Sequence, residues 1–154
     1  MRISQRGLYA LKALVHLAES WDHGLVKIRV LAGDEAIPEK FLEAILVVLK
    51  NAQIVSSQRG REGGYRLRRP PSEIRIGEVI RFIDGPLAPF GDAAELAHRI
   101  RTERRHPGLF EIFLEVRDAA SAILDHATLA DLVARNRRIL SSRPPGDSRA
   151  ETVA

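Results

Sequence analysis

The sequence predicts a mainly α-helical protein with one small β-hairpin and a long helix near its C-terminal end. Three observations predict this fold class. Over most of the chain, apolar residues recur every three or four positions, which is the period of an amphipathic helix. Residues 56–71, SSQRGREGGYRLRRPP, are instead rich in glycine and change to a period of two, which is typical of a hairpin. Residues 109–124 keep a heptad-like apolar spacing, which predicts a single long helix.

The composition allows one domain with an appendage and excludes several classes of protein. Of the 154 residues, 45% are hydrophobic, which is enough for a core. The net charge of +4 favours polyanionic partners mildly. Because there is no cysteine, disulfides, Cys-ligated zinc and thiolate-bound iron–sulfur clusters are excluded. No apolar run is long enough to span a bilayer, and MRISQRGLYA lacks the apolar core of a signal peptide, so we expect a cytoplasmic protein without a membrane partner.

The first amphipathic segment begins after Ser4, which suits a helix N-cap. The spacing predicts a helix of about four turns, with this apolar face: Leu8, Leu11, Leu14, Val15 and Ala18. The sequence WDHG ends it, and residues 26–28 predict a short extended piece. Residues 29–35 predict a short helix, although Gly33 inside it costs about 1 kcal/mol.

A tight turn and a second helix follow. Pro38 suits the first position of this helix because its fixed φ is already helical. The predicted apolar face consists of Leu42, Ile45, Leu46 and Leu49. The residues off that face are Glu39, Lys40, Glu43 and Lys50. A short helix, a turn and a second helix predict a helix-turn-helix, in which the second helix enters the major groove of DNA.

The glycine-rich stretch has two candidate interpretations, a phosphate-binding Walker loop and a hairpin. A Walker loop needs lysine and then Ser or Thr after its last glycine, followed by a helix. Here Gly64 precedes Tyr-Arg-Leu-Arg, whose alternation predicts a strand. With residues 54–58 as its partner strand, the tip carries Arg59 and Arg61, which can contact phosphates. A solvated surface hairpin is the alternative, but the preceding helix-turn-helix favours a wing, and hence a winged helix-turn-helix.

The C-terminal half predicts three further helical segments and a tail. Residues 76–83 predict a short helix, and residues 92–101 predict a helical turn or two. In residues 109–124 the helix is more apolar than a lone surface helix needs, so we expect a second copy to bury it; packing within the same chain is the alternative. The expected dimerisation residues are Leu109, Ile112, Phe113, Val116, Ala120 and Ile123. Thr128 suits the N-cap of a last short helix.

The predicted organisation has three parts. Residues 1–84 form a winged helix-turn-helix DNA-binding domain. Residues 85–140 form a linker or sensor segment together with the dimerisation helix. Residues 141–154 have no apolar period and predict a disordered tail.

The order of these motifs resembles the IscR/NsrR/CymR family of bacterial winged-helix transcription regulators, over about residues 1–135. The matching sequences are MRIS and GLYAL at the start, IPEKFLEAIL in the reading helix, VSSQRGREGGYRLRRPPSEIRIGEVI in the wing and its exit, then DGPLAP and ATLADLV. The wing sequence followed by Ile-Gly-Glu-Val-Ile is the specific part of the match.

The resemblance implies a homodimer, with the long helix across the two-fold axis, that binds pseudo-palindromic double-stranded DNA near promoters; we expect a repressor. Ser4 and Lys27 suit phosphate contacts. The DNA-binding residues that the resemblance implies are Ser4, Lys27, Pro38, Glu39, Lys40, Glu43, Arg59, Gly60, Arg61, Gly63 and Gly64.

Within that set, the resemblance implies distinct roles for the reading helix and the wing. Lys40 and Glu43 would face bases, and a carboxylate such as that of Glu43 can accept a hydrogen bond from cytosine N4. Arg59 and Arg61 would contact the groove at the wing. Four other residues are interpreted as core residues: Tyr9, Leu42, Tyr65 and Leu67.

The chain departs from the family at its sensor segment. Members that sense through an iron–sulfur cluster carry three cysteines between DGPLAP and the long helix, and this chain has none. His98 and His106 lie in this segment, with Asp92 and Glu95, but their spacing fits no metal template, so we interpret them as surface histidines and expect no metal and no cofactor. Leu8 supplies no carboxylate ligand near the N-terminus either.

Two glycines that often occur in the family, at the turn and after the reading helix, are Ala36 and Gln53 here. A left-handed conformation at Gln53 would cost about 1 kcal/mol.

The leading hypothesis is a sequence-specific regulator without a cluster, whose signal is a small molecule or a protein effector at the dimer region. The alternative is a basic dimeric protein-interaction module that no longer reads an operator. Affinity for duplex DNA that falls steeply with salt distinguishes the two. No spacing predicts a Ser/His/Asp set, a Cys/His pair or paired carboxylates, so we do not expect an enzyme.

Overall fold

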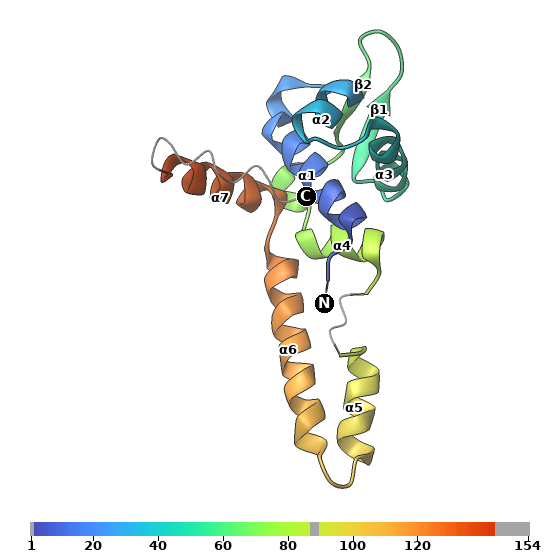
Figure 1. Ribbon diagram of the computed structural model, residues 1–154, viewed down its shortest axis with the longest axis vertical. Coiled ribbons are helices and arrows are strands. Elements are labelled where there is room, and N and C mark those ends of the chain that lie inside the picture. The colour runs from blue at the N-terminus through green and yellow to red at the C-terminus, as the bar shows by residue number, and fades with distance from the viewer. Residues whose placement is uncertain (1, 87–89, 144–154) are drawn as a thin grey trace.

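The computed structural model describes residues 2–86 and 90–143 as a helical head, an arm of two helices and a helix that packs back on the head (Figure 1). The elements are α1 (Gln5–Glu19), η1 (Trp21–His23), α2 (Ile28–Asp34), α3 (Glu39–Asn51), β1 (Val55–Gln58), β2 (Gly64–Leu67), η2 (Pro71–Glu73), α4 (Ile76–Asp84), α5 (Ala93–Thr102), α6 (Pro107–His126) and α7 (Leu129–Ser141). The prediction of a mainly helical fold with a small hairpin is confirmed. The predicted tail begins inside α7, and residues 144–154 lie outside the described ranges.

Helix α1 confirms most of the apolar face that its spacing predicted, since Leu14 and Ala18 are buried and Leu11 and Val15 pack against the core. The buried residues are Gly7, Ala10, Ala13, Leu14, Leu17 and Ala18. Leu8, which was expected to be in the core, is 47% exposed. The prediction was wrong for Leu8 only, because the buried stripe is centred on the small residues Ala10 and Ala13 and Leu8 lies at its edge. Helices α2, α3, α4 and α7 all contact α1, and the alanines allow them to approach closely.

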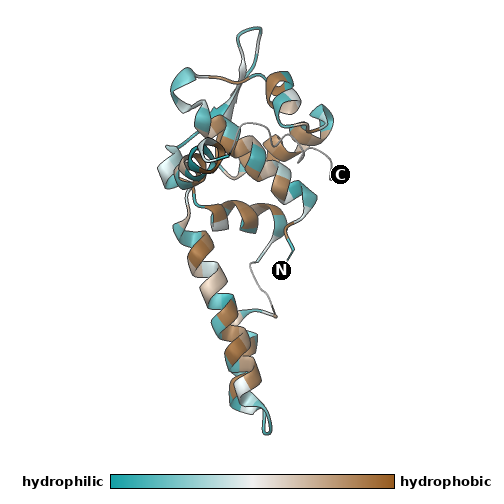
Figure 2. Ribbon diagram, turned by 60° about the vertical axis from the view of Figure 1, so that its left-hand side comes forward, coloured by the Kyte–Doolittle hydropathy of each residue, from teal (hydrophilic) through white to brown (hydrophobic). Residues whose placement is uncertain are grey.

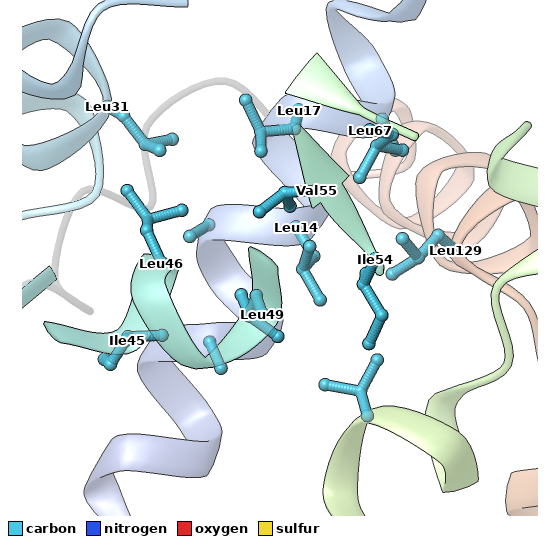
Figure 3. Packing of buried hydrophobic residues seen from close by; sticks show 14 of the residues in the cluster. Leu14, Leu17, Leu31, Ile45, Leu46, Leu49, Ile54, Val55, Leu67 and Leu129 are labelled. Carbon is cyan, nitrogen blue, oxygen red and sulfur yellow. The ribbon is translucent and has the colours of Figure 1, made fainter. Parts of the chain in front are cut away.

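The core joins the head helices to the hairpin and to α7 (Figure 3). The predicted apolar face of α3 is confirmed, since Leu42, Ile45, Leu46 and Leu49 are all fully buried. Ile54, Val55 and Leu67 bring the hairpin into the same cluster. Leu129 and Val133 of α7 complete it, although the sequence had placed them with the arm. The last helix is therefore part of the head's core.

Several C-terminal helices differ in length from the predictions. Helix α6 contains the whole predicted segment 109–124 and is 20 residues long. Helix α5 has 10 residues, more than the turn or two expected, because Asp92 caps it by accepting a hydrogen bond from Glu95 N at 2.8 Å. Helix α7 has 13 residues and starts with a capping box of Thr128 and Asp131. Within the described ranges, none of the helices combines the length and apolarity needed to cross a membrane.

Polar contacts join the arm to the head where α6 ends. Asp125 accepts hydrogen bonds from Arg75 through its backbone oxygen at 2.6 Å and from Arg81 through its carboxylate at 2.5 Å. Leu129 N donates to Ile74 O at 3.0 Å, and Ile76 N donates to Ala127 O at 2.9 Å. These contacts fix the direction in which α6 leaves the head.

The turns on either side of α3 contain residues in the left-handed region. Ala36 has φ 52° and Gln53 has φ 61°, so both residues that replace family glycines are left-handed. For residues with a Cβ atom, this conformation costs roughly 1–2 kcal/mol.

We expect Gln53→Gly to raise the free energy of unfolding by about 0.5–1 kcal/mol. Glycine removes the left-handed strain, which outweighs its greater loss of chain entropy on folding. The side chain of Gln53 is exposed and makes only a long 3.4 Å hydrogen bond to Lys50 O. Urea unfolding at one fixed protein concentration measures the change. The control is Ala134→Gly, at an exposed position in the middle of α7, which should destabilise by about 1 kcal/mol. Destabilisation by both variants would show that Gln53 is not strained.

Candidate nucleic-acid interface

A hollow of about 710 Å³ lies between α3, α2 and the hairpin. Figure 1 shows α3 beside the two strands, whose connecting tip projects beyond the head. The hollow is lined by Lys27, Ile28, Arg29, Val30, Glu43, Leu46, Val47, Lys50, Ser57, Gln58, Arg59, Gly60, Arg61, Gly63, Gly64 and Tyr65. It therefore brings together most of the residues that the sequence assigned to DNA binding.

The lining of the hollow is strongly basic. Its cationic side chains are Lys27, Arg29, Lys50, Arg59 and Arg61, and its single carboxylate is Glu43. Arg29 approaches Glu39 at 4.0 Å and Lys50 donates to Ser57 Oγ at 2.8 Å. In residues 2–86 and 90–143, Arg59 and Arg61 form no ion pair, and both are exposed. Two exposed guanidinium groups at a projecting tip suit bidentate contacts with phosphate.

Glu43 and Tyr65 face each other across the hollow from α3 and β2. Burial, and second the nearby Glu43 carboxylate, raise the pKa of the Tyr65 hydroxyl above its ordinary value. The sequence interpreted Tyr65 as a core residue; the structure places it, half-buried, in the wall of the hollow. Tyr9 is also only half-buried, and its ring lies edge-on to Phe41 at 5.7 Å.

The hairpin is held against the head by the backbone of Val26. Val26 N donates to Tyr65 O and Tyr65 N donates to Val26 O, both at 2.8 Å. A Cβ atom at Gly64 would lie 2.6 Å from Val26 O, and one at Gly63 would overlap the backbone oxygen of Gln58. The close approach of backbone therefore explains these two glycines, which the sequence had assigned to the DNA interface. Gly60, with φ 108°, shapes the tip.

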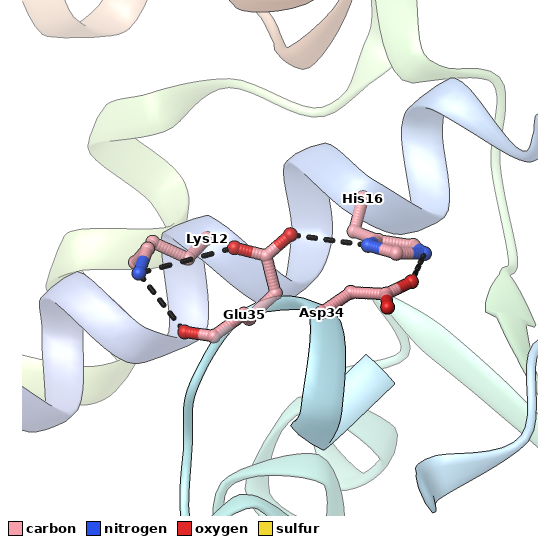
Figure 4. A network of polar contacts seen from close by, with 4 residues as sticks. All are labelled: Lys12, His16, Asp34 and Glu35. Atoms are coloured by element: carbon pink, nitrogen blue, oxygen red, sulfur yellow. Dashed lines mark hydrogen bonds and ion pairs between the residues drawn. The ribbon is translucent and has the colours of Figure 1, made fainter. Parts of the chain in front are cut away.

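Helix α2 is positioned by a polar network with α1 (Figure 4). His16 Nδ1 lies 3.0 Å from Glu35 Oε1, and its Nε2 lies 3.8 Å from Asp34. Lys12 Nζ donates to Glu35 O at 3.0 Å. Sequence reasoning missed this network because the four residues come from two helices that only the tertiary fold brings together.

The remaining residues assigned from the sequence lie outside the hollow. Pro38 is the N-cap of α3 and not its first residue. Together with Lys40 it lines an adjoining hollow of about 500 Å³ beside α1. Glu39 approaches Arg29. All three are exposed, so a ligand can reach them.

Ser4 is engaged within the chain. Its Oγ accepts a hydrogen bond from Gly7 N at 2.9 Å and donates to the carboxylate of Asp84, to which Ser4 N also donates at 2.9 Å. A serine hydroxyl has one hydrogen to donate. With that hydrogen directed to Asp84, Ser4 caps α1 and ties it to α4, and it has none left for the phosphate contact expected from the sequence.

Helix α6 carries apolar residues along much of its length (Figure 2), and several of their side chains are exposed. Leu109, Ile112, Val116 and Ile123, the exposed row of α6, are each between 47% and 68% exposed. Phe113, which the sequence assigned to the same row, stacks on Phe90 with 4.4 Å between ring centroids. Its ring also lies edge-on to Phe110 at 6.2 Å. Phe113 therefore packs within the chain, on a direction about 100° around the helix from Ile112. Ala120 is half-buried.

A family model named Rrf2, described as an iron-dependent transcriptional regulator, matches residues 3–135. The residues of this chain do not fit a cluster held by thiolates, since the sequence contains no cysteine. In the described part of the chain, no group of three or more His, Asp and Glu side chains is arranged so that it could hold a metal ion. His98 and His106, which the sequence left as surface residues, are both exposed.

Known proteins similar to this chain are regulators of the same kind. A helix-turn-helix-type transcriptional regulator of Mycobacterium tuberculosis is 40% identical over 134 residues, covering 86% of this chain and 81% of that protein. CymR of Bacillus subtilis is 34% identical over 132 residues, covering 86% of this chain and 89% of CymR.

Solved structures extend this similarity to the fold. The structure of B. subtilis CymR, the global cysteine regulator, matches with a TM-score of 0.76 and 32% identity, over 88% of this chain and 98% of that chain. T. potens IscR matches with a TM-score of 0.71 and 26% identity, over 94% of each chain. The predicted winged helix-turn-helix fold and the family resemblance are confirmed. The chain belongs to the Rrf2 family of transcriptional regulators, which are helix-turn-helix proteins and not enzymes.

Proposed function

We propose that this protein is a sequence-specific DNA-binding repressor that acts as a homodimer on a pseudo-palindromic operator, without an iron–sulfur cluster. The observation that carries the proposal is the basic hollow between α3 and the wing, with five cationic side chains and one carboxylate in its lining. Such a surface attracts the DNA backbone. The proposal places the protein in the cytoplasm, where bacterial DNA is.

The proposed division of roles follows from charge. Arg59 and Arg61 at the tip of the wing, and Lys27 at its base, contact phosphates or the minor groove and position the protein. Glu43 repels phosphate, so its favourable role in a groove is to accept a hydrogen bond from a base. The Tyr65 hydroxyl, in the lining of the same hollow, is a further group that can donate a hydrogen bond there.

The exposed row on α6 supports the homodimer. Leu109, Ile112, Val116 and Ile123 are separated by intervals of three, four and seven residues, which is the spacing of a coiled-coil seam. Two copies joined along this row would present two reading helices to two half-sites. A small molecule or protein effector that binds at the arms would change their separation and thereby the affinity for DNA.

We expect Glu43→Ala and Arg59→Ala to change DNA binding in different ways. Glu43→Ala should relax base preference by roughly 1–3 kcal/mol at one position in each half-site and leave non-specific binding equal or stronger. Arg59→Ala should weaken binding to operator and unrelated DNA alike. It should also lower the slope of log K against log salt by about one for each phosphate that the protein no longer neutralises.

Titrations of both variants against the operator and a scrambled duplex, at several salt concentrations, test these expectations. The matched control is Arg137→Ala, an exposed arginine of α7 outside the lining of the hollow, which should leave affinity and salt slope unchanged. If Glu43→Ala lowers both affinities equally, Glu43 is a structural residue of α3. If the unmodified protein binds no duplex with salt-dependent affinity, the proposed function is wrong.

A further inference from the structure

Helix α3 presents an apolar side chain at the centre of its outward face. At about 100° per residue, Lys40, Ala44 and Val47 lie within about 60° of one another around the axis, and this row is opposite the buried leucines. Val47 is 53% exposed. Although it lines the basic hollow, it can neither donate nor accept a hydrogen bond.

A single exposed valine is ordinary on a protein surface; the surroundings of Val47 are what distinguish it. It lies one turn beyond Glu43, about 6 Å further along the helix. Val30 of α2 is 49% exposed and lines the same hollow. Ala44, between Lys40 and Val47, is exposed and small, so that it leaves room for the helix to approach a groove. Val30 and Val47 thus place an exposed apolar patch in the lining of the cationic hollow.

Major-groove chemistry offers one apolar partner for such a patch. The base edges there carry donors and acceptors, with the 5-methyl group of thymine as the apolar exception. A valine pressed against a donor or acceptor would remove its water without replacing the hydrogen bond. Against a thymine methyl group, the same contact buries apolar surface on both partners.

We propose that Val47, supported by Val30, reads the 5-methyl group of a thymine in each half-site, one or two base steps from the base that Glu43 contacts. The inference rests on the proposed function, because it requires α3 to lie in the major groove. It adds a specificity determinant that depends on a methyl group and not on hydrogen bonding.

Uracil lacks only the 5-methyl group of thymine, so replacing thymine by uracil measures the contribution of that methyl group alone. The probe is a duplex that the full-length protein selects from a random-sequence library, remade with each thymine replaced in turn by uracil. At one thymine per half-site, we expect the affinity of the protein to fall about fourfold per site, the factor that corresponds to one buried CH₂ group. Replacement at the other thymines should have little effect.

The variant Val47→Ala tests whether Val47, and not another residue, contacts the thymine methyl group. It should bind the thymine duplex as weakly as the unmodified protein binds the uracil duplex, and show no further loss of affinity with uracil. The fold is retained because Val47 is exposed and alanine favours helix. Ile139→Ala, which truncates an exposed apolar residue on α7, is the matched control and should keep the full thymine–uracil difference.

Each outcome has one meaning. Equal affinity of the unmodified protein for thymine and uracil duplexes overturns the inference and leaves the proposed function standing. A thymine–uracil difference that persists in Val47→Ala overturns the assignment to Val47. Failure to select any sequence overturns the proposed function, and the inference with it.

Discussion

Replacing both Ile112 and Val116 by glutamate is expected to convert the protein into monomers and to weaken operator binding by about 10²–10⁴-fold. Both side chains lie in the exposed row of α6, one turn apart. In the proposed dimer they are buried against a second copy. Four glutamates per dimer would then be desolvated without partners, at a cost that exceeds the gain from burying the rest of the row. A monomer reaches one half-site only, and so lacks the advantage of binding two linked half-sites.

Phe113 is unsuitable for this test, because its ring stacks on Phe90 within the chain and its replacement would also remove that contact. The control is Ala122→Glu, which adds the same charge at an exposed position of α6 about 100° from the centre of the row. Sedimentation measures the mass of each variant, and titration with duplex DNA measures its affinity. An intact dimer of Ile112→Glu/Val116→Glu would place the interface elsewhere, whereas monomers of Ala122→Glu would show that any charge on the helix is disruptive.

Gly64→Ala is expected to lower the free energy of unfolding by about 1–3 kcal/mol, the usual cost of overpacking, and to weaken DNA binding more than Arg59→Ala does. The new Cβ atom would lie 2.6 Å from Val26 O and 2.8 Å from Val26 C. Since backbone cannot rotate aside as a side chain does, β2 must move away. That movement lengthens the two 2.8 Å hydrogen bonds between Val26 and Tyr65 and displaces both wing arginines together.

The matched control is Gly33→Ala in α2, where a Cβ atom meets nothing within 4 Å. Alanine there should stabilise the helix by up to about 1 kcal/mol. Thermal or urea unfolding at fixed protein concentration measures both variants, and DNA titration follows. A Gly64→Ala protein with unchanged stability would show that the wing is not seated on Val26. Unchanged DNA affinity in a destabilised Gly64→Ala protein would show that the position of the wing does not matter for binding.

Much of the fold could be predicted because it follows from short-range backbone geometry. Leu42, Ile45 and Leu49 repeat at the helical period, and all are buried on α3. The change to a period of two at Tyr65 predicted β2, and the glycines around it predicted the tip. The basic residues of the wing were also identifiable, since Arg59 and Arg61 stand beside those glycines in the chain.

The candidate site could be predicted only in part. Sequence reasoning placed Glu43 and Arg59 in it, and the structure brings both to one hollow. It did not identify Val47 or Val30, because an apolar residue in a helical pattern is usually a core residue. It assigned Tyr65 to the core, against which the residue does pack, but did not foresee that Tyr65 also lines the hollow.

The sequence by itself determined which segments are helix and strand, because hydrophobic periodicity and capping act between residues a few positions apart. Only the tertiary structure decided which exposed side chains share a surface and which polar groups are already paired. Ser4 lies 80 residues from Asp84 in the chain. Its hydroxyl donates to the Asp84 carboxylate, whereas the sequence had suggested that it contacts a DNA phosphate. The role of Phe113 was decided in the same way, because its ring stacks on the ring of Phe90 within the chain. Contacts of this kind depend on how whole elements pack, and local spacing carries no information about them.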